Sequence, residues 1–588
     1  MNQRHLPVLV VVAALTILLV GGALHYGGRL IQAAQAAAPV SVEAICHTCH
    51  NEVRPIVPAQ EEGDGDGDGE GAAQDDDEAG AAQDGEAEAQ VPSSTADHSQ
   101  YEILQQDFAT APEVTEACLS CHNQADMQLH ATTHWNWEFE HPVTGELLGK
   151  QHVINNSTLS IAGNEEYCAT CHNGYGFSGE DFDFTSARNI DCLSCHDTTG
   201  DYEKLPGAAG NPAYTPTEYP PGSGNIWQPP DLTRIAQQVG STSRQTCGSC
   251  HFNEQNVEPV IHGHLPHQLS DPPPELDVHM GTEHLDFSCA TCHEPQNHDF
   301  WASQYYPVSL RDDVPEHLVH TTCVSCHTGQ NVHGNDALNQ HMDRVACQSC
   351  HIPEYGRAGP TMTSWDWSTA GRTDDQGNPI VERNAEGLLI YDSRYGSFAW
   401  DTNIVPEYVW TTGIISYTQV GDTFDPTAGV TINQIQGSYD DPNAQLWPVS
   451  RFRGIQPYDS ENNYLVAVDL YAGEQADDQA TAFWETFDWN AAIQAGMALE
   501  GVPYSGQYDF IETERYWMLN HSVAPADQAV RCSACHSRDG RLAGLSGSYV
   551  PGRDYNRLLD SIGWMLLAGV FLAVLFHAFL RFLHGRMF

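Results

Sequence analysis

The sequence predicts a loop-rich fold of mainly short α-helices with little β-structure, in which stacked prosthetic groups replace much of the side-chain core. Three observations support this prediction. The 588-residue chain contains nine copies of Cys-x-x-Cys-His, which use all 18 cysteines. Division of the chain among these motifs leaves about 65 residues for each, too few for nine independent hydrophobic cores. The 50 glycines and 33 prolines are typical of a chain with many turns and irregular loops.

Each motif has the spacing of a covalent haem attachment site. Its two cysteines can bond the two vinyl groups of one porphyrin, and the next residue then lies under the iron as an imidazole ligand. Zinc ribbons and disulfide frameworks also use paired cysteines, but neither explains a histidine after every pair. We therefore predict nine covalently bound haems c. The attachment cysteines and axial histidines are Cys46, Cys49 and His50; Cys118, Cys121 and His122; Cys168, Cys171 and His172; Cys192, Cys195 and His196; Cys247, Cys250 and His251; Cys289, Cys292 and His293; Cys323, Cys326 and His327; Cys347, Cys350 and His351; and Cys532, Cys535 and His536.

Residues 1–40 have the composition of a signal peptide or a signal anchor. Bacteria attach haem to such motifs outside the cytoplasmic membrane, so an export signal is required. Residues 6–24 form an apolar or small run after Arg4, and an alanine-rich stretch follows. This 19-residue run is longer than most signal-peptide cores and long enough to span a bilayer. Cleavage and retention of the segment are therefore both open.

Residues 41–60 carry the first haem motif, and an acidic segment follows at 61–96. The stretch 61–90 contains 13 acidic residues and no basic one, a composition typical of a disordered linker. We expect this linker to tether the Cys46 haem to the main body. The net charge of the chain is −54, and −41 remains when those 13 acids are set aside. So acidic a body excludes nucleic acid as a partner and requires a local basic lining for any anionic substrate.

The second axial ligands of the irons are expected among the histidines outside the motifs. The chain has 30 histidines, and several lie in short polar contexts that suit ligation. The predicted distal ligands are His98, His134, His262, His279, His298, His333, His341 and His521. The nearest substitutes are His264, His267, His284 and His320. The sequence does not pair these histidines with individual irons.

Lysine is rare in this chain, since only Lys150 and Lys204 stand among the 24 basic residues. Lys150 lies in the string GELLGKQHVINN, 18 residues ahead of Cys168. A desolvated lysine can lose its proton and offer a neutral amine to iron, which an always-charged arginine cannot do. Lys150 is therefore a candidate iron ligand, with an ordinary exposed lysine as the alternative. Lys204, in a loop rich in glycine and proline, is expected to be exposed.

Residues 352–531 contain no cysteine and many tryptophans, and we expect them to form an arm that wraps the haem stack. Arg357, Arg451 and Arg453 could line a path for an anion. Pairing of these arginines with the abundant carboxylates is the favoured interpretation.

The C-terminal region 561–588 is predicted to be a transmembrane helix with a short cytoplasmic tail. Residues 562–580 form an apolar run with one ionisable side chain, His577, and arginines follow at 581 and 586. These arginines and Arg4 place both ends in the cytoplasm and the haem-bearing body on the periplasmic face of the membrane. An interfacial position is the favoured interpretation of His577, with contact to a membrane cytochrome b as the alternative.

Long strings in the region 97–560 carry a family resemblance. They include EVTEACLSCH, ATTHWNWE, LLGKQHVINN, CATCHNGYGF, NIDCLSCHDTTGDY, ACQSCHIPEYGR, GSYDDPNAQLWP and FDWNAAIQAGM. On these strings the region resembles the tetrathionate reductase-like octahaem c-type cytochromes. The chain has no Cys-x-x-Cys-Lys motif, which argues against the pentahaem nitrite reductases, and the strings do not resemble those of the hydroxylamine oxidoreductases.

The resemblance implies a body of eight haems, seven with two imidazole ligands and one with a distal lysine at the active site. Transferred by position, it implies that Cys168, Cys171 and His172 hold the reactive haem and that Lys150 is its distal ligand. The implied function is reduction of a small sulfur or nitrogen oxyanion of the tetrathionate, nitrite or hydroxylamine class. A quinol-linked cytochrome b or another donor would supply the electrons. The alternative is a non-catalytic conduit between such a cytochrome b and another redox partner, and whether the protein forms a homo-oligomer is open.

Overall fold

The computed structural model describes residues 96–585 apart from 142–143, 156, 158, 178–181, 221–222, 254–262, 301–322, 328–331 and 473–480. The predicted signal segment, the Cys46 haem site and the acidic linker up to residue 95 lie outside the described residues. The chain divides into two compact units, 1–83 with 328–340 and 84–327 with 341–588. In the described part of the first unit, the His333 backbone N–H donates to Asn339 Oδ1 at 3.1 Å. The elements discussed in the following paragraphs belong to the second unit, except for α12 (Asp336–His341), whose residues up to 340 belong to the first.

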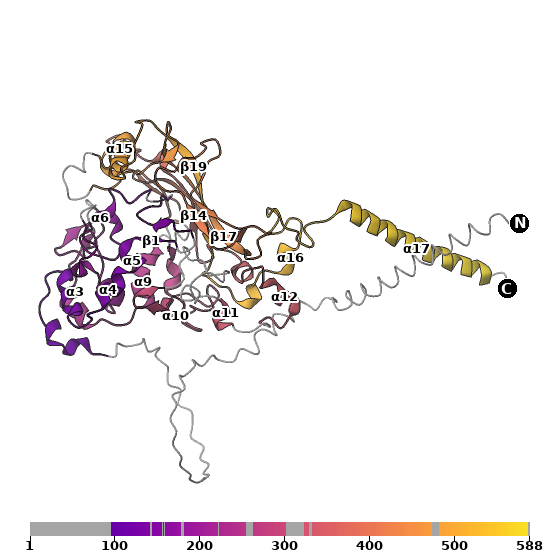
Figure 1. The fold of residues 1–588 in the computed structure, drawn as a ribbon, viewed down its shortest axis with the longest axis horizontal. Coiled ribbons are helices and arrows are strands. Elements are labelled where there is room, and N and C mark those ends of the chain that lie inside the picture. Colours follow the sequence, from indigo (N-terminus) through magenta and orange to yellow (C-terminus); the bar gives the residue numbers. More distant parts are fainter. Residues whose placement is uncertain are drawn as a thin grey trace, which may run out of the picture. The chain divides into compact units, whose positions relative to one another are not determined.

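Residues 96–300 consist mainly of short helices joined by loops, drawn in indigo and magenta in Figure 1. The helix α3 begins after Thr110, whose backbone N–H donates to Glu113 Oε2 at 3.3 Å, and a proline occupies its first turn. Its apolar face packs with Leu104, Leu193 and Ile235 in one buried cluster. The Cys118 motif begins within α3 (Ala111–Leu119). The helices of this region that carry no haem motif are η1 (His98–Gln100), η2 (Glu102–Leu104), α4 (Ala125–His130), α5 (Thr133–Asn136), η3 (Ala187–Asn189), α8 (Leu232–Gln237) and η4 (His267–Ser270).

The haem motifs fold as single helical turns. In the motifs of Cys289, Cys323 and Cys532, the histidine backbone N–H bonds the carbonyl of the first cysteine, four residues earlier, at 2.8 Å. This turn brings both cysteines and the histidine of a motif into one local site. The motif helices are α6 (Glu165–Cys168), α7 (Leu193–His196), α9 (Arg244–His251), α10 (Cys289–Cys292), α11 (Cys323–Cys326), α13 (Gln348–His351) and α16 (Cys532–Cys535), and α12 (Asp336–His341) precedes α13.

The predicted class of short helices and loops around haem is confirmed, with one addition. The wrapping arm contains a nine-stranded sheet where little β-structure is expected. The strand order is β10-β11-β12-β9-β17-β19-β15, and β13 and β18 also pair with β17. These strands are β9 (Thr361–Asp366), β10 (Val381–Arg383), β11 (Leu389–Asp392), β12 (Gly396–Asp401), β13 (Glu407–Thr411), β15 (Val430–Thr431), β17 (Gln445–Asp459), β18 (Tyr464–Leu465) and β19 (Tyr508–Met518).

The two longest strands, β17 and β19, run antiparallel from the pair Val449 and Met518 to the pair Asp459 and Tyr508. Along β19 buried residues alternate with more exposed ones, as expected for a strand with one covered face. This alternation includes the charged residue Arg515 among the buried positions. A polar or charged residue at a buried register position hides the strand pattern in the sequence, which explains why the sheet was not predicted.

Smaller ladders and helices complete the body. The two-stranded sheets are β1 (Glu138–Glu140) with β2 (Leu147–Gly149), β3 (Thr217–Glu218) with β4 (Ile226–Trp227), β5 (Phe252–Asn253) with β6 (Leu265–Pro266), β7 (Pro295–Gln296) with β8 (Asp299–Phe300), and β14 (Ile415–Tyr417) with β16 (Asn433–Ile435). The remaining helices are η6 (Trp367–Thr369), α14 (Phe483–Thr486), α15 (Trp489–Leu499) and η8 (Ala526–Gln528).

The sheet packs directly against the segment that carries Lys150. Leu148 and Val153, on either side of the lysine, belong to the same buried cluster as Trp447, Val449 and Met518 of the central strands. Burial of such side chains contributes roughly 1.5–3 kcal/mol each to stability. The wrapping arm therefore fixes the position of the Lys150 segment.

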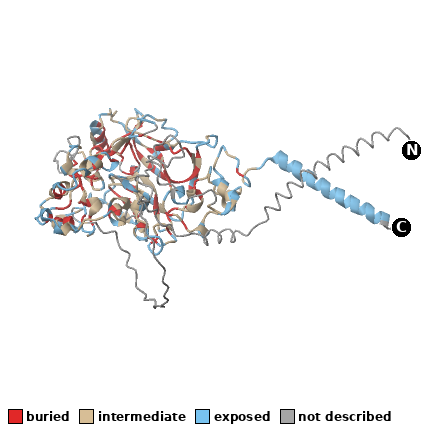
Figure 2. Cartoon of the chain, turned by 60° about the horizontal axis from the view of Figure 1, so that its bottom comes forward, coloured by how far each residue is buried: buried red, intermediate tan, exposed pale blue. Residues whose placement is uncertain are grey.

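The last helix, α17 (Arg557–Gly585), differs from the others in length and exposure. Its side chains are exposed from Arg557 to His584, as the pale blue helix in Figure 2 shows. By length and composition this helix is apolar enough to cross a membrane.

Candidate functional site

Cysteines of different haem motifs lie next to one another. The side chains of Cys118 and Cys192 lie next to each other, as do those of Cys171 and Cys250. The same holds for Cys247 with Cys289 and for Cys323 with Cys347. Cys195 and Cys250, Cys292 and Cys326, and Cys350 and Cys535 lie within electrostatic range of each other. These contacts link the eight described motifs into one continuous series, with a branch at the Cys247 motif.

Several motif histidines are held in the orientation that metal binding requires. The Nδ1–H of His196 donates to the Gly240 carbonyl at 2.8 Å, that of His251 to Gly263 at 2.9 Å, and that of His536 to Pro551 at 2.8 Å. A histidine that donates from Nδ1 presents an unprotonated Nε2 on the other side of the ring. These carbonyls therefore fix the tautomer that can bind iron.

Six of the predicted distal histidines lie opposite a motif histidine. Two imidazoles bound to opposite faces of one metal ion through bonds of about 2 Å place their ring centres roughly 6 Å apart. The observed ring-centre distances all lie near this value. They are 6.4 Å for His98 and His122, 6.3 Å for His134 and His251, 6.4 Å for His196 and His298, 6.1 Å for His279 and His327, 6.1 Å for His293 and His521, and 6.0 Å for His341 and His536.

The planes of these ring pairs fall into two groups. The pairs of His98 with His122 and of His293 with His521 are nearly parallel, at 18° and 19°. The other four pairs are steeply crossed, at 68°, 76°, 79° and 86°.

Burial lowers the pKa of His134 and of His521 to about 4, so both rings are neutral at physiological pH and keep a lone pair for iron. The donor set thus fits haem iron with two nitrogen ligands.

Lys150 is held at the end of a tight hairpin. β1 and β2 pair Glu138 with Gly149, and the Gln151 backbone N–H donates to the Trp137 carbonyl at 3.3 Å. Gly149 has a φ of +112°, and a Cβ there would overlap the Trp137 carbonyl and lie 2.6 Å from the Glu138 Cα. Only glycine fits this close approach of two backbones, so the residue before Lys150 is determined by geometry.

The lysine lies within electrostatic range of the Cys168 motif, where it acts on both Cys168 and His172. Burial lowers the pKa of Lys150 to about 8; the Cys168 thiolate opposes this shift, and the Arg515 charge adds to it. Burial, reinforced by the Lys150 charge, lowers the pKa of His172 to about 3. The His172 ring is covered by Trp137, whose ring centre lies 4.1 Å away. The arrangement therefore places a neutral imidazole and an easily deprotonated amine at one motif.

A buried arginine and a buried histidine lie near Lys150. Arg515 of β19 is only 3% exposed, and its guanidinium lies 3.8 Å from the centre of the Trp517 ring. Burial lowers the pKa of His264 to about 3, with contributions from His251, Arg515 and Lys150, so this ring is neutral at physiological pH. The Nδ1 atom of His264 is buried and has no hydrogen-bond partner among the described residues. Arg515 thus supplies the local positive charge that an anionic ligand needs in a chain of charge −54.

Lys204, expected to be an exposed lysine, is buried instead. Its Nζ donates to the His172 carbonyl at 2.9 Å and pairs with Asp191 Oδ2 at 3.1 Å. The expectation was wrong because the Gly/Pro-rich loop folds inward over the motif instead of facing solvent. The signal that could have identified Lys204 is the same rarity of lysine that singled out Lys150.

The other predicted residues have varied outcomes. His262 and His320 lie outside the described residues, and His333 belongs to the described segment of the first unit. Arg451 pairs with Glu407 and Glu514 at 3.1 and 3.7 Å, in agreement with the favoured interpretation. Arg357 instead donates to backbone carbonyls, including that of Ser522 at 3.1 Å, and so links separate loops by hydrogen bonds.

Comparisons with known proteins identify the family of the chain. The family model described as Cytochrome c bacterial matches residues 362–539, and none of the curated proteins matches the chain. Among solved structures, the octahaem cytochrome c from Shewanella oneidensis is similar, with a TM-score of 0.67 and 32% sequence identity. The match covers 78% of this chain and 98% of that chain. On this identity and coverage, the chain belongs to the octahaem c-type cytochrome family and binds haem c covalently.

Proposed function

We propose that this protein is a membrane-anchored, extracytoplasmic enzyme that reduces a small sulfur or nitrogen oxyanion of the tetrathionate, nitrite or hydroxylamine class. One observation carries the proposal. Six motif histidines face a second imidazole at ligand spacing, whereas His172 has Lys150 as its charged neighbour. Electron relay alone is served equally well by another imidazole, so the lysine marks the site where the chemistry differs.

The ring distances support a ligand assignment. In this proposal eight haems occupy the main body, 97–560, and a ninth is bound at Cys46, Cys49 and His50. The six histidine pairs would hold six of the irons, Lys150 with His172 would hold a seventh, and His351 would bind the eighth. Bound haem supplies one-electron transfer and an iron that a substrate can reach.

Lys150 has the properties of a displaceable ligand. With a pKa of about 8, its Nζ changes between amine and ammonium close to neutral pH. The neutral amine can bind a metal ion, but the ammonium has no lone pair left to donate. Substrate entry is therefore coupled to uptake of a proton by Nζ, and the proton then lies beside the bound anion. With Lys150 and His172 both bound, the iron would have no position open to substrate, and protonation of Nζ would open one.

Arg515 supports an anionic substrate, because it lies near Lys150 and its guanidinium is always charged. His264 also lies near Lys150 but is neutral at physiological pH. A buried cation attracts an anion more strongly than an exposed one because less water screens the interaction. Tetrathionate and nitrite are anions, so this lining favours them over neutral hydroxylamine.

The membrane position rests on α17. The helix is long and apolar, its side chains are exposed, and arginines lie near its C-terminal end. The Cys532 motif is the haem site nearest to α17 in the chain. A membrane donor such as a quinol-linked cytochrome b would therefore pass electrons first to this motif and on through the linked motifs to Cys168.

A second candidate function is a non-catalytic electron conduit. The continuous series of cysteine contacts favours it, because a series of neighbouring haems suits long-range transfer. The conduit does not explain why one site has a lysine.

The deciding experiment measures reduction of tetrathionate, nitrite and hydroxylamine by the dye-reduced protein and by Lys150→His. We expect the wild type to reduce at least one of the three substrates. The variant should lose about a hundredfold in kcat/KM, since a second imidazole would occupy the position on the iron that the substrate needs. Haem content by pyridine haemochrome assay must match in both. Equal rates in the two proteins, or no wild-type activity on any substrate, would contradict the enzyme and favour the conduit.

A further inference from the structure

We propose that Lys204 and Asp191 form a buried ion pair that positions the His172 motif against the next haem motif and sets the reduction potential of the haem at Cys168. The inference rests on the proposed role of that haem as the reactive one. It adds two positioning residues for this site, neither of which binds iron or substrate.

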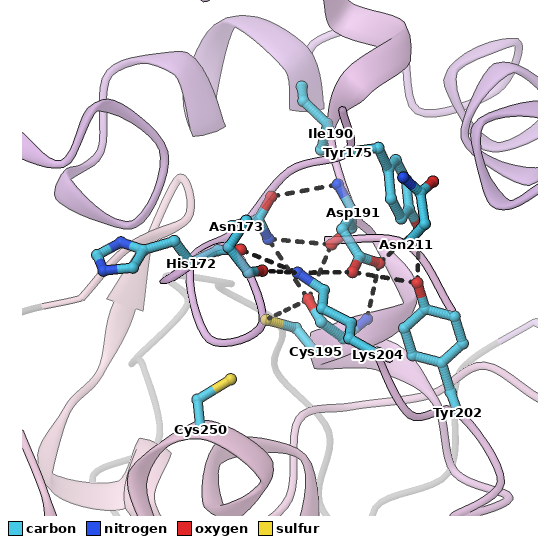
Figure 3. Close-up of polar contacts among 12 residues, drawn as sticks. His172, Asn173, Tyr175, Ile190, Asp191, Cys195, Tyr202, Lys204, Asn211 and Cys250 are labelled. Atoms are coloured by element: carbon cyan, nitrogen blue, oxygen red, sulfur yellow. Dashed lines mark hydrogen bonds and ion pairs between the residues drawn. The ribbon is translucent and has the colours of Figure 1, made fainter. Parts of the chain in front are cut away.

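The first step is the contact with the motif itself. Lys204 Nζ donates to the carbonyls of His172 at 2.9 Å and of Ala169 at 3.4 Å. Figure 3 shows the His172 ring pointing away from the lysine while its backbone faces it. The ammonium thus satisfies carbonyls at the C-terminal end of the motif turn, where a cation is favourable.

The second step is the anchoring of the lysine. Its partner Asp191 is 1% exposed and precedes Cys192 in the chain. Asp191 Oδ1 accepts from the Tyr175 hydroxyl at 2.7 Å and from the Ser194 backbone N–H at 3.1 Å, and Oδ2 accepts from the Tyr202 hydroxyl at 3.2 Å. Four donors, counting Lys204, therefore hold the carboxylate in a single orientation.

The third step is the link between the two motifs. Asn173, directly after His172, donates from Nδ2 to the Asp191 carbonyl at 3.0 Å and accepts from the Asp191 N–H at 3.2 Å. The ion pair and this amide bridge join the end of one motif to the start of the next. A shift of Asp191 would therefore move both haem attachment sites together.

The fourth step is electrostatic. The Lys204 ammonium lies within electrostatic range of Cys171, Cys195 and Cys250, which belong to three different motifs, and Figure 3 shows Cys195 near it. In the pair, its charge is balanced by Asp191. Removal of one partner leaves the other charge buried and uncompensated. An uncompensated carboxylate disfavours an added electron nearby, and an uncompensated ammonium favours one.

The test uses two single variants with opposite expected signs. Lys204→Met should lower the midpoint potential of the Cys168 haem by about 59 mV or more, which equals a tenfold change in a one-electron equilibrium constant. Asp191→Asn should raise it. The double variant Lys204→Met with Asp191→Asn should return toward the wild-type value. The potentials are measured on the full haem-loaded chain by optical and EPR-monitored redox titration.

A purely structural role for the pair would move both single variants in the same direction, because either change would loosen the same contacts. That result, or an unchanged potential in Lys204→Met, would overturn the proposal. If Lys204→Met does not retain full haem content, Asp191→Asn and the double variant still decide the sign. The titration needs no substrate, so inactivity of the wild type would contradict the proposed function without affecting this test.

Discussion

The six sites with paired imidazoles and the site of His172 use one motif but different surroundings. At the paired sites, a second ring lies about 6 Å from the first, and where the contact is visible a backbone carbonyl orients the motif histidine. At His172 the neighbours are Lys150, the Trp137 ring and the buried ion pair of Lys204. The motif determines where haem is attached, whereas residues distant in the chain determine what each haem can do.

Among the variants that test this difference between the sites, Gly149→Ala should have the largest effect on activity and stability. The added Cβ would overlap the Trp137 backbone at a φ that side chains rarely adopt, and so displace Lys150. We expect a loss of about 3 kcal/mol in the free energy of unfolding and of about a hundredfold in kcat. Denaturant unfolding and steady-state assays measure both.

Gly145→Ala is the matched control. Gly145 also has a positive φ, of +69°, but the nearest atom to its Cβ would be Glu140 Oε1 at 3.8 Å. It should lose about 1 kcal/mol in stability and keep its activity. Equal activity losses in the two variants would show that hairpin strain, and not the position of Lys150, accounts for the effect.

Arg515→Gln tests the charge that distinguishes the lysine site. We expect the KM for tetrathionate or nitrite to rise about tenfold, because a charge-assisted contact is lost, while the KM for neutral hydroxylamine changes less than about twofold. Arg451→Gln removes an arginine from the neighbouring strand, one that is paired with Glu407 and Glu514, and should leave both values unchanged. A parallel rise for all substrates would argue against anion binding by Arg515.

The pH dependence should also differ between the two kinds of site. Iron competes with the proton for Lys150 Nζ, so the lysine-bound spectrum should grow as the pH rises, with a midpoint at or below the amine pKa of about 8. The fraction of protonated amine falls about tenfold per pH unit above that midpoint, and the turnover rate should fall with it. In Lys150→His this transition should vanish. Persistence of the transition in that variant would assign it to another group.

The smallest effect is expected when a paired site receives a lysine. His298 faces His196 of the Cys192 motif, which lies on the branch of the cysteine series and not between Cys532 and Cys168. His298→Lys should therefore keep turnover within about twofold of the wild type while it changes the spectrum of one haem. A large loss would mean that ligand exchange at any haem is damaging, which would weaken the conclusion drawn from Lys150→His.

Much of this site could be predicted from the sequence because haem attachment is a local property. The cysteines and histidine of a motif lie within five residues, and Lys150 stood out through the rarity of lysine. Pairing of the distal histidines could not be predicted, since His521 reaches His293 across more than 200 residues. The sheet was missed because Arg515 occupies a buried strand position, and Lys204 because its loop folds inward.

The ring angles of the histidine pairs have a spectroscopic consequence. Parallel imidazole planes lift the degeneracy of the iron d orbitals and give rhombic EPR signals, whereas crossed planes leave the orbitals nearly degenerate and give a single signal at very low field. The nearly parallel pairs His98–His122 and His293–His521 should therefore be resolved from the four crossed pairs in frozen solution. The two classes of haem then carry different intrinsic labels, by which the order of their reduction can be followed without any mutation.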